Sequence, residues 1–112
     1  MMSRAIEELS PRSFCERWPD EHRTDVQLLD VREPAELDIA PLPNAVHIPM
    51  LEVPMRLDEL DHERPIVVVC HSGQRSRHVA GFLLANGFER VYNLAGGIDA
   101  WSVDIDPKLP RY

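Results

Sequence analysis

The sequence has few cysteines and no cysteine pair at metal-binding spacing. Its two cysteines, Cys15 and Cys70, stand far apart, and no Cys-x-x-Cys motif occurs. Five histidines are scattered along the chain and do not complete a zinc-knuckle pattern, so we expect no bound metal. A disulfide framework is not expected from so few cysteines either. We interpret Cys15 as a small hydrophobic residue on a helix.

Long apolar runs are also missing. No stretch approaches the roughly 20 apolar residues that a membrane-spanning helix requires. The N-terminal sequence MMSRAIEELSPRS has no apolar core of the kind found in signal peptides. We therefore expect a cytoplasmic protein with no membrane partner.

Positive charge is scarce. The chain carries 19 acidic and 12 basic residues, for a net charge of -7. Such a surface repels phosphate backbones and argues against nucleic acid as the main partner. A small anion would have to bind at a local positive site, against the overall field.

The apolar residues that are present form a pattern of alternating strands and helices. At 112 residues and 44% hydrophobic content, we expect one domain, residues 1–112. Ser10 and Pro11 mark a helix start. Residues 51–60 also have apolar residues at helical spacing, and the proline-containing tail 102–112 is expected to wrap the surface. Strands are predicted at 26–31, 45–48, 66–69 and 91–94, and further helices at 33–37, 76–86 and 98–101. This order predicts an α/β fold with a mainly parallel sheet and helices on both faces.

The loop after the strongest strand carries the candidate chemistry. Residues 70–76 read Cys-His-Ser-Gly-Gln-Arg-Ser, and ligands of such sheets bind at the carboxyl ends of strands. There, backbone N–H groups and the next helix dipole favour the thiolate of Cys70. Arg75 would add positive charge, Gly73 would let the loop close around an anion, and Ser76 could cap the helix. The competing interpretation is a buried strand-end cysteine in a plain connecting loop.

Four segments resemble the rhodanese family, in the right order and over nearly the whole chain. The motif Cys-x-x-Gly-x-Arg-Ser at 70–76 resembles the family's active-site loop. Residues 29–37 resemble its Asp-x-Arg segment, residues 44–49 its Ala-x-x-Ile-Pro strand, and residues 94–101 its Gly-Gly-x-x-x-Trp turn. One departure lies at 39–43, where Ile-Ala-Pro-Leu-Pro replaces a His-Ile-x-Gly stretch and leaves the local backbone shape open.

The resemblance implies a three-layer α/β/α domain with a five-stranded, mainly parallel sheet, whose short first strand lies near Ile6. It implies a sulfurtransferase that moves sulfane sulfur from thiosulfate or a persulfide donor to cyanide or a thiol. Cys70 would be the catalytic nucleophile and carry the persulfide, and a sulfur-accepting protein is a further candidate acceptor. No cofactor is implied. The substrate-binding residues would be His71, Ser72, Gly73, Gln74, Arg75 and Ser76.

Asp30 and Arg32, near the end of an inner strand, are interpreted as supporting residues that pin loops more than they shape the pocket rim. His71 is expected to pack on the loop or lie in solvent. The loop would hold an anion through its backbone N–H groups, which leaves the His71 side chain outside this cradle.

Three alternatives stay open. Cell-cycle phosphatases and arsenate reductases of related fold share a Cys-to-Arg cradle, but the phosphatase loop has five intervening residues where this chain has four. A regulatory module without turnover typically lacks the cysteine. A redox sensor would need Cys15 and Cys70 to meet.

Overall fold

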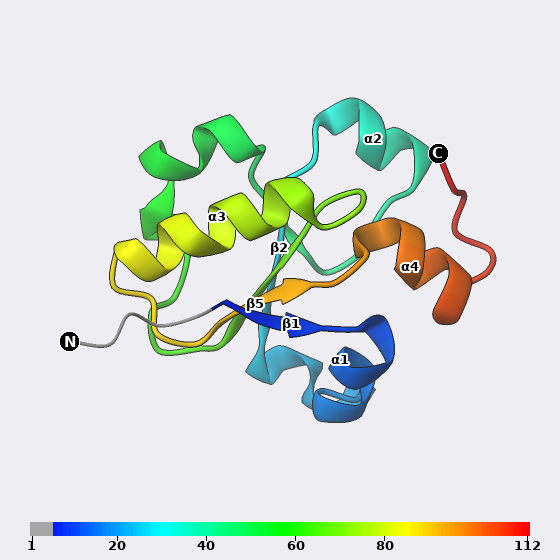
Figure 1. Cartoon of the computed structure of the whole chain (residues 1–112), viewed down its shortest axis with the longest axis horizontal. Helices are drawn as coiled ribbons and strands as arrows, with labels where there is room; N and C mark the ends of the chain where they lie inside the picture. Colours follow the sequence, from blue (N-terminus) through cyan, green and yellow to red (C-terminus); the bar gives the residue numbers. More distant parts are fainter. Residues whose placement is uncertain (1–5) are drawn as a thin grey trace.

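A computed structural model describes residues 6–112. Residues 1–5, part of the N-terminal stretch without a signal-peptide core, lie outside the described residues. The elements in chain order are β1 Glu7–Leu9, α1 Pro11–Arg17, η1 Asp20–Asp25, β2 Gln27–Asp30, α2 Pro34–Ile39, β3 Val46–His47, η2 Met50–Met55, η3 Leu57–Glu59, β4 Ile66–Val69, α3 Gln74–Ala85, β5 Val91–Leu94 and α4 Gly97–Asp104, where η denotes a 3₁₀ helix (Figure 1).

The strands form one five-stranded sheet in the order β1-β5-β4-β2-β3. Every neighbouring pair is parallel, which confirms the expected parallel sheet and the short first strand. The register aligns Asp30 with Val69, so β2 and β4 end side by side. Cys70 follows Val69 directly and therefore lies at the carboxyl edge of the sheet, where such folds bind ligands.

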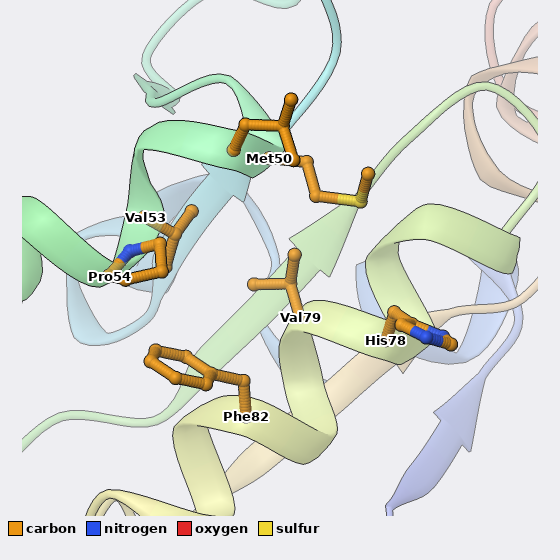
Figure 2. Close-up of a pocket in the computed structure, with 7 residues that line it drawn as sticks. Met50, Val53, Pro54, His78, Val79 and Phe82 are labelled. Atoms are coloured by element: carbon orange, nitrogen blue, oxygen red, sulfur yellow. The ribbon is translucent and has the colours of Figure 1, made fainter.

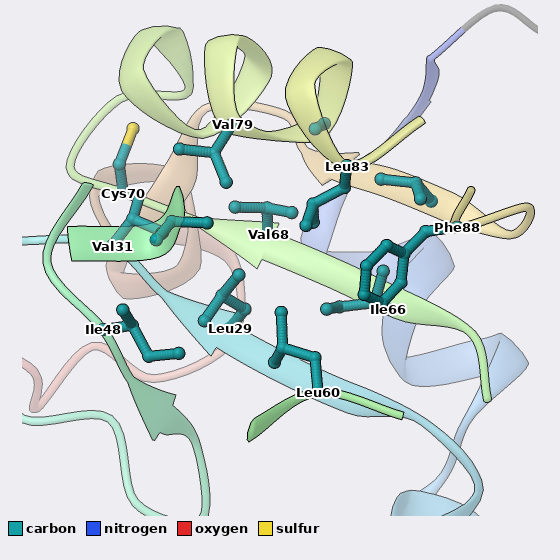
Figure 3. Close-up of a cluster of buried hydrophobic side chains, with 13 residues drawn as sticks. Leu29, Val31, Ile48, Leu60, Ile66, Val68, Cys70, Val79, Leu83 and Phe88 are labelled. Atoms are coloured by element: carbon teal, nitrogen blue, oxygen red, sulfur yellow. The ribbon is translucent and has the colours of Figure 1, made fainter. Parts of the chain in front are cut away.

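Two hydrophobic cores lie on the two faces of the sheet. Along β4, Ile66 and Val68 belong to one core, and Val67 and Val69 belong to the other, because successive strand side chains point to opposite faces. Residues from α3 and η2 complete the first core, and residues from α1 and α4 complete the second. The three layers expected from the alternating pattern are thus confirmed. Figure 3 shows the first core, with Cys70 at its edge and its sulfur directed toward the start of α3.

Helix α1 begins as its sequence predicts. Ser10 has extended backbone angles, and its side chain accepts a hydrogen bond from the Ser13 backbone N–H, while Pro11 occupies the first helical position. This arrangement satisfies one of the N–H groups that lack partners at the start of a helix.

Residues 51–60 do not form the single helix that their apolar spacing indicates. The segment forms two short 3₁₀ helices, η2 and η3, and Pro54 lies inside the first of them. Proline has no N–H to donate and disrupts an α-helical interior. Leu51 and Met55, which belonged to the apolar face of the expected helix, are 80% and 79% exposed.

The last helix and the tail extend further than the sequence indicates. Helix α4 continues to Asp104, past the short helix expected at 98–101. Beyond it, buried Leu109 accepts a hydrogen bond through its carbonyl from the Ser102 hydroxyl. The chain then turns back so that its end lies beside α2 (Figure 1). Within residues 6–112, none of the helices has the length and apolar character needed to cross a membrane.

Candidate active site

The first turn of α4 fixes the backbone of the loop that starts at Cys70. The carbonyl of Cys70 accepts a hydrogen bond from the Ile98 N–H at 2.9 Å, and the carbonyl of His71 accepts one from the Asp99 N–H at 3.0 Å. Gly97 permits this close approach, since a Cβ there would lie 2.4 Å from the Cys70 carbonyl oxygen. The Gly-Gly turn of the sequence is therefore part of the candidate site.

Hydrogen-bond donors converge on the sulfur of Cys70. Gly73, in the left-handed conformation with φ of 104°, directs its N–H at Sγ over 3.1 Å. The Ser76 hydroxyl lies 3.3 Å from the same sulfur. Burial of Cys70 raises the thiol pKa, but the Ser76 hydroxyl and the N–H groups of Ser76, Gly73 and Ser72 outweigh that effect and lower the pKa below its ordinary value. The loop therefore favours the thiolate, the nucleophilic form.

Ser76 does not cap α3, contrary to the sequence expectation. The helix begins at Gln74 with Gly73 as its N-cap residue, so Ser76 already lies within the first turn. Its buried side chain points at the sulfur and also forms a short hydrogen bond with Asn93 Oδ1. The Ser76 hydroxyl, expected to cap the helix, instead forms a hydrogen bond with the sulfur of Cys70.

Arg75 gives the cradle less positive charge than the motif indicates. Its guanidinium pairs with both oxygens of Glu36, at 2.7 and 2.8 Å. The Arg75 hydrogen bonds hold the pKa of Glu36 at about 2, so the carboxylate stays charged and compensates the arginine. Arg75 thus ties the loop to α2, while its expected positive charge is largely compensated by Glu36.

Asp30 and Arg32 form a buried pair with each other. Both side chains are about 1% exposed or less, and Arg32 Nη2 and Nε donate to Asp30 at 2.8 and 3.0 Å. Arg32 Nη1 donates to the Tyr112 hydroxyl at 3.0 Å. The His47 ring bonds the Arg32 carbonyl, so this pair connects β2, β3 and the tail.

Tyr112 joins the tail to the loop, a contact that the sequence did not reveal. Its hydroxyl donates to Glu36 Oε1 at 3.0 Å, and its ring stacks on His71 with centroids 4.1 Å apart and planes 12° from parallel. The His71 side chain therefore packs against the C-terminal tail. Through Glu36 the same tyrosine also reaches Arg75.

The remaining loop side chains face outward. Ser72 and Gln74 are exposed, so these two members of the expected binding set offer side chains to solvent at the rim. Among residues 6–112, no three histidine, cysteine or carboxylate side chains gather closely enough to hold a metal ion.

An apolar cavity of about 200 Å³ lies between η2 and α3 (Figure 2). It provides mainly apolar contacts, whereas the hydrogen-bond donors that converge on Cys70 Sγ belong to the loop. The residues that line the cavity are Met50, Leu51, Val53, Pro54, His78, Val79 and Phe82.

Comparison with known proteins agrees with this geometry. The family model of the rhodanese-like domain matches residues 17–104, which include β2 to α4 and the loop from Cys70 to Ser76. The chain belongs to the rhodanese-like family.

Two relatives that match most of the chain are named sulfurtransferases. A sulfurtransferase from Allochromatium vinosum is 38% identical over 97 residues, covering 87% of this chain and 89% of the relative. The thiosulfate sulfurtransferase GlpE from Actinobacillus pleuropneumoniae is 36% identical over 100 residues, covering 89% and 90%. The crystal structure of a rhodanese-like domain protein from Staphylococcus aureus has a TM-score of 0.79 at 29% identity, covering 96% of this chain and 99% of that one. At family level the chain is therefore a rhodanese-type transferase.

Proposed function

We propose that the protein transfers sulfane sulfur through a persulfide on Cys70. The observation that carries this proposal is the convergence of the Gly73 N–H and the Ser76 hydroxyl on Cys70 Sγ, at 3.1 and 3.3 Å. These donors lower the pKa of the thiol despite its burial and favour the nucleophile. Thiosulfate and persulfides are the proposed donors, and cyanide, thiols or a sulfur-accepting protein are the proposed acceptors.

The reaction divides into two displacements. The Cys70 thiolate attacks the outer sulfur of thiosulfate, the donor S–S bond breaks, and sulfite leaves with the electron pair. The product is a persulfide anion, Cys–S–S⁻, which the loop N–H groups stabilise as an oxyanion hole stabilises developing charge. A thiolate or cyanide then attacks the outer sulfur, and the Cys70 thiolate leaves. Both steps need no cofactor in this proposal.

Loop size argues against phosphate as the substrate. Four residues separate Cys70 from Arg75, and the Gly73 N–H reaches the cysteine sulfur itself. A phosphoryl group needs room for a central phosphorus with three equatorial oxygens and in-line attack. The tight cradle suits one additional sulfur better. In this proposal the related phosphatases and arsenate reductases are therefore the less suitable analogues.

The decisive experiment incubates the protein with thiosulfate and measures the intact mass. We expect a gain of one sulfur atom that disappears on addition of cyanide, and no gain in Cys70→Ser. A glutathione persulfide donor tested in parallel identifies which donor loads the site faster. An aryl phosphate forms the control arm, and robust hydrolysis by the wild-type protein would favour the phosphatase alternative over sulfur transfer.

A further inference from the structure

Asn93 is a buried amide directly behind the sulfur cradle. It lies on β5, is fully buried, and its Nδ2 donates at 3.0 Å both to the Gly73 carbonyl and to Glu8 Oε1. Because both of these partners are acceptors, the amide nitrogen must face them. The amide oxygen therefore faces Ser76 and accepts its short hydrogen bond.

The Ser76 hydroxyl has one proton and two acceptors within reach. One acceptor is Asn93 Oδ1, and the other is Cys70 Sγ at 3.3 Å. A hydroxyl donates one hydrogen bond at a time and can accept others. In the thiol state both contacts are satisfied together, since the Cys70 S–H donates to Ser76 Oγ and Ser76 donates to Asn93. In the thiolate state no S–H remains, and the sulfur anion can accept the Ser76 hydroxyl proton in addition to the Gly73 N–H.

We propose that Asn93 is a positioning residue that competes with the Cys70 sulfur for the Ser76 hydroxyl proton. When Cys70 ionises, its proton passes to solvent, and the Ser76 hydroxyl rotates from Asn93 to the sulfur anion. The buried Asn93 oxygen then loses its donor, which costs free energy and restrains ionisation. The same hydroxyl is available to the persulfide anion. The inference about ionisation of the Cys70 thiol stands on geometry alone. Only its effect on sulfur transfer rests on the proposed function.

Each charged group around the cradle has a partner of opposite charge, whether Cys70 is a thiol or a thiolate. Glu36 neutralises Arg75, and Arg77 pairs with Glu8 behind Asn93. Because these pairs do not depend on the cysteine proton, the Ser76 hydroxyl is the group that must change partner. The charged and titratable pairs that face the cradle from the packed elements are Arg75 with Glu36, Glu8 with Arg77, Asp30 with Arg32, and His71 stacked on Tyr112.

A double-mutant cycle tests the competition. In a Cys15→Ser background, thiolate absorbance gives the pKa of Cys70 without any sulfur-transfer assay. Asn93→Leu should lower this pKa by roughly 0.5 to 1 unit, because the hydroxyl then serves the thiolate alone. Ser76→Ala should raise it. In the Ser76→Ala background, Asn93→Leu should no longer lower it, since the remaining effects are the lost hydrogen bonds to the Gly73 carbonyl and to Glu8.

Gln27→Leu is the matched control. Gln27 is a buried amide at the opposite end of the sheet, where it bonds the Asp61 backbone through both side-chain atoms. Its replacement should cost stability and leave the Cys70 pKa in place. An equal shift from Asn93→Leu in both Ser76 backgrounds, or an upward shift with Ser76 present, would overturn the proposal.

A measurement on the protein without any Asn93 substitution covers the case in which Asn93→Leu does not fold. The side-chain carbonyl carbon of Asn93 should show an NMR shift that titrates with Cys70, because its hydroxyl donor leaves. That titration should vanish in Ser76→Ala. A carbonyl signal unaffected by Cys70 ionisation, or one that titrates equally without the serine hydroxyl, would rule out the proton exchange. Failure of sulfur loading with an intact titration would instead refute the proposed function alone.

Discussion

The two cysteines of this chain differ in a way that burial does not explain. Cys70 is 1% exposed, yet hydrogen bonds from its loop lower its pKa. Cys15 is only partly buried, yet desolvation raises its pKa, and Arg23 offsets that effect incompletely. The comparison teaches that converging donors decide which thiol ionises. Cys70 has them because its loop folds back over the sulfur, whereas Cys15 lies on a helix that packs against other side chains.

The sheet separates the two cysteines. Cys70 belongs to the core on the α3 face, and Cys15 packs against the core on the α1 and α4 face. Both are free thiols. A disulfide between them would have to cross the strands, so the two-cysteine redox sensor lacks the geometry it needs.

The largest expected effect comes from exchanging each sulfur for oxygen. Cys70→Ser should reduce sulfur transfer by roughly 10³-fold or more, because a serine hydroxyl neither ionises in this cradle nor forms a persulfide. Cys15→Ser should leave the rate close to that of the wild type. Cyanide-dependent turnover and the intact mass after thiosulfate treatment should be measured for both variants. Substantial turnover by Cys70→Ser, or a large loss in Cys15→Ser, would remove the functional difference between the two thiols.

A second prediction disturbs the loop from behind. In Gly97→Ala the new Cβ would lie 2.4 Å from the Cys70 carbonyl oxygen, at a φ of 58°. The loop must shift, so we expect a stability loss of about 2–4 kcal/mol and at least a roughly tenfold fall in sulfur loading.

Gly87→Ala provides the control, because Gly87 has a φ of 91° but no atom within 4 Å of the added Cβ. It should cost stability through backbone strain alone and retain loading. Denaturant unfolding and persulfide formation measured on both variants separate strain from loop displacement. If both variants load sulfur equally well, the contact with α4 does not position the loop.

The parts of this site that follow from sequence are the local ones. The β-branched run of β4 and the Cys-to-Ser loop after it are contiguous, so their pattern predicted both the strand and the position of Cys70 directly after it. Glu36 could not be found this way, because it meets Arg75 across 39 positions. Asn93 and Tyr112 reach their partners Ser76 and Glu36 over 17 and 76 positions.

Local pattern also misjudged two details. Ser76 has the residue type of a cap, but the left-handed Gly73 starts the helix earlier and turns that side chain inward. The spacing of residues 51–60 suggested one regular helix with an apolar face, whereas Pro54 favours 3₁₀ turns that leave Leu51 exposed. In both cases one backbone-directing residue outweighs the periodicity around it.

A third, smaller effect should follow from loosening the Arg75 tether, which Cys15 lacks. Glu36 has a pKa of about 2 in the folded protein against an ordinary 4.5, so it stabilises the fold above about pH 4.5 and loses that contribution as pH falls toward 2. Glu36→Gln should therefore cost about 1–3 kcal/mol at pH 7 and much less near pH 2. Sulfur loading should fall a few-fold as the loop loosens.

Glu52→Gln is the comparison variant, since Glu52 lies on η2 and its exposed carboxylate pairs with Arg56. Such surface pairs contribute roughly 0–1 kcal/mol, so its effect should be small at every pH. Urea unfolding at several pH values measures both variants. A Glu36→Gln deficit that stays constant down to pH 2 would show that the charge of Glu36 does not stabilise the loop.

The smallest expected effect is that of salt, and it tests whether short hydrogen bonds or long-range charge set the reactivity of Cys70. The net charge of -7 repels thiosulfate, and Glu36 compensates the loop's own Arg75. Salt screens the repulsion but scarcely affects bonds of about 3 Å inside the cradle. Raising an inert salt from low concentration to about 0.15 M should therefore leave the thiosulfate loading rate within roughly twofold, or raise it. Two salts with different anions distinguish screening from occupation of the cradle, because only occupation depends on the anion's identity. A steep loss with both salts would mean that long-range attraction draws the donor in, and that Cys70 owes its advantage over Cys15 to charge as well as to hydrogen bonds.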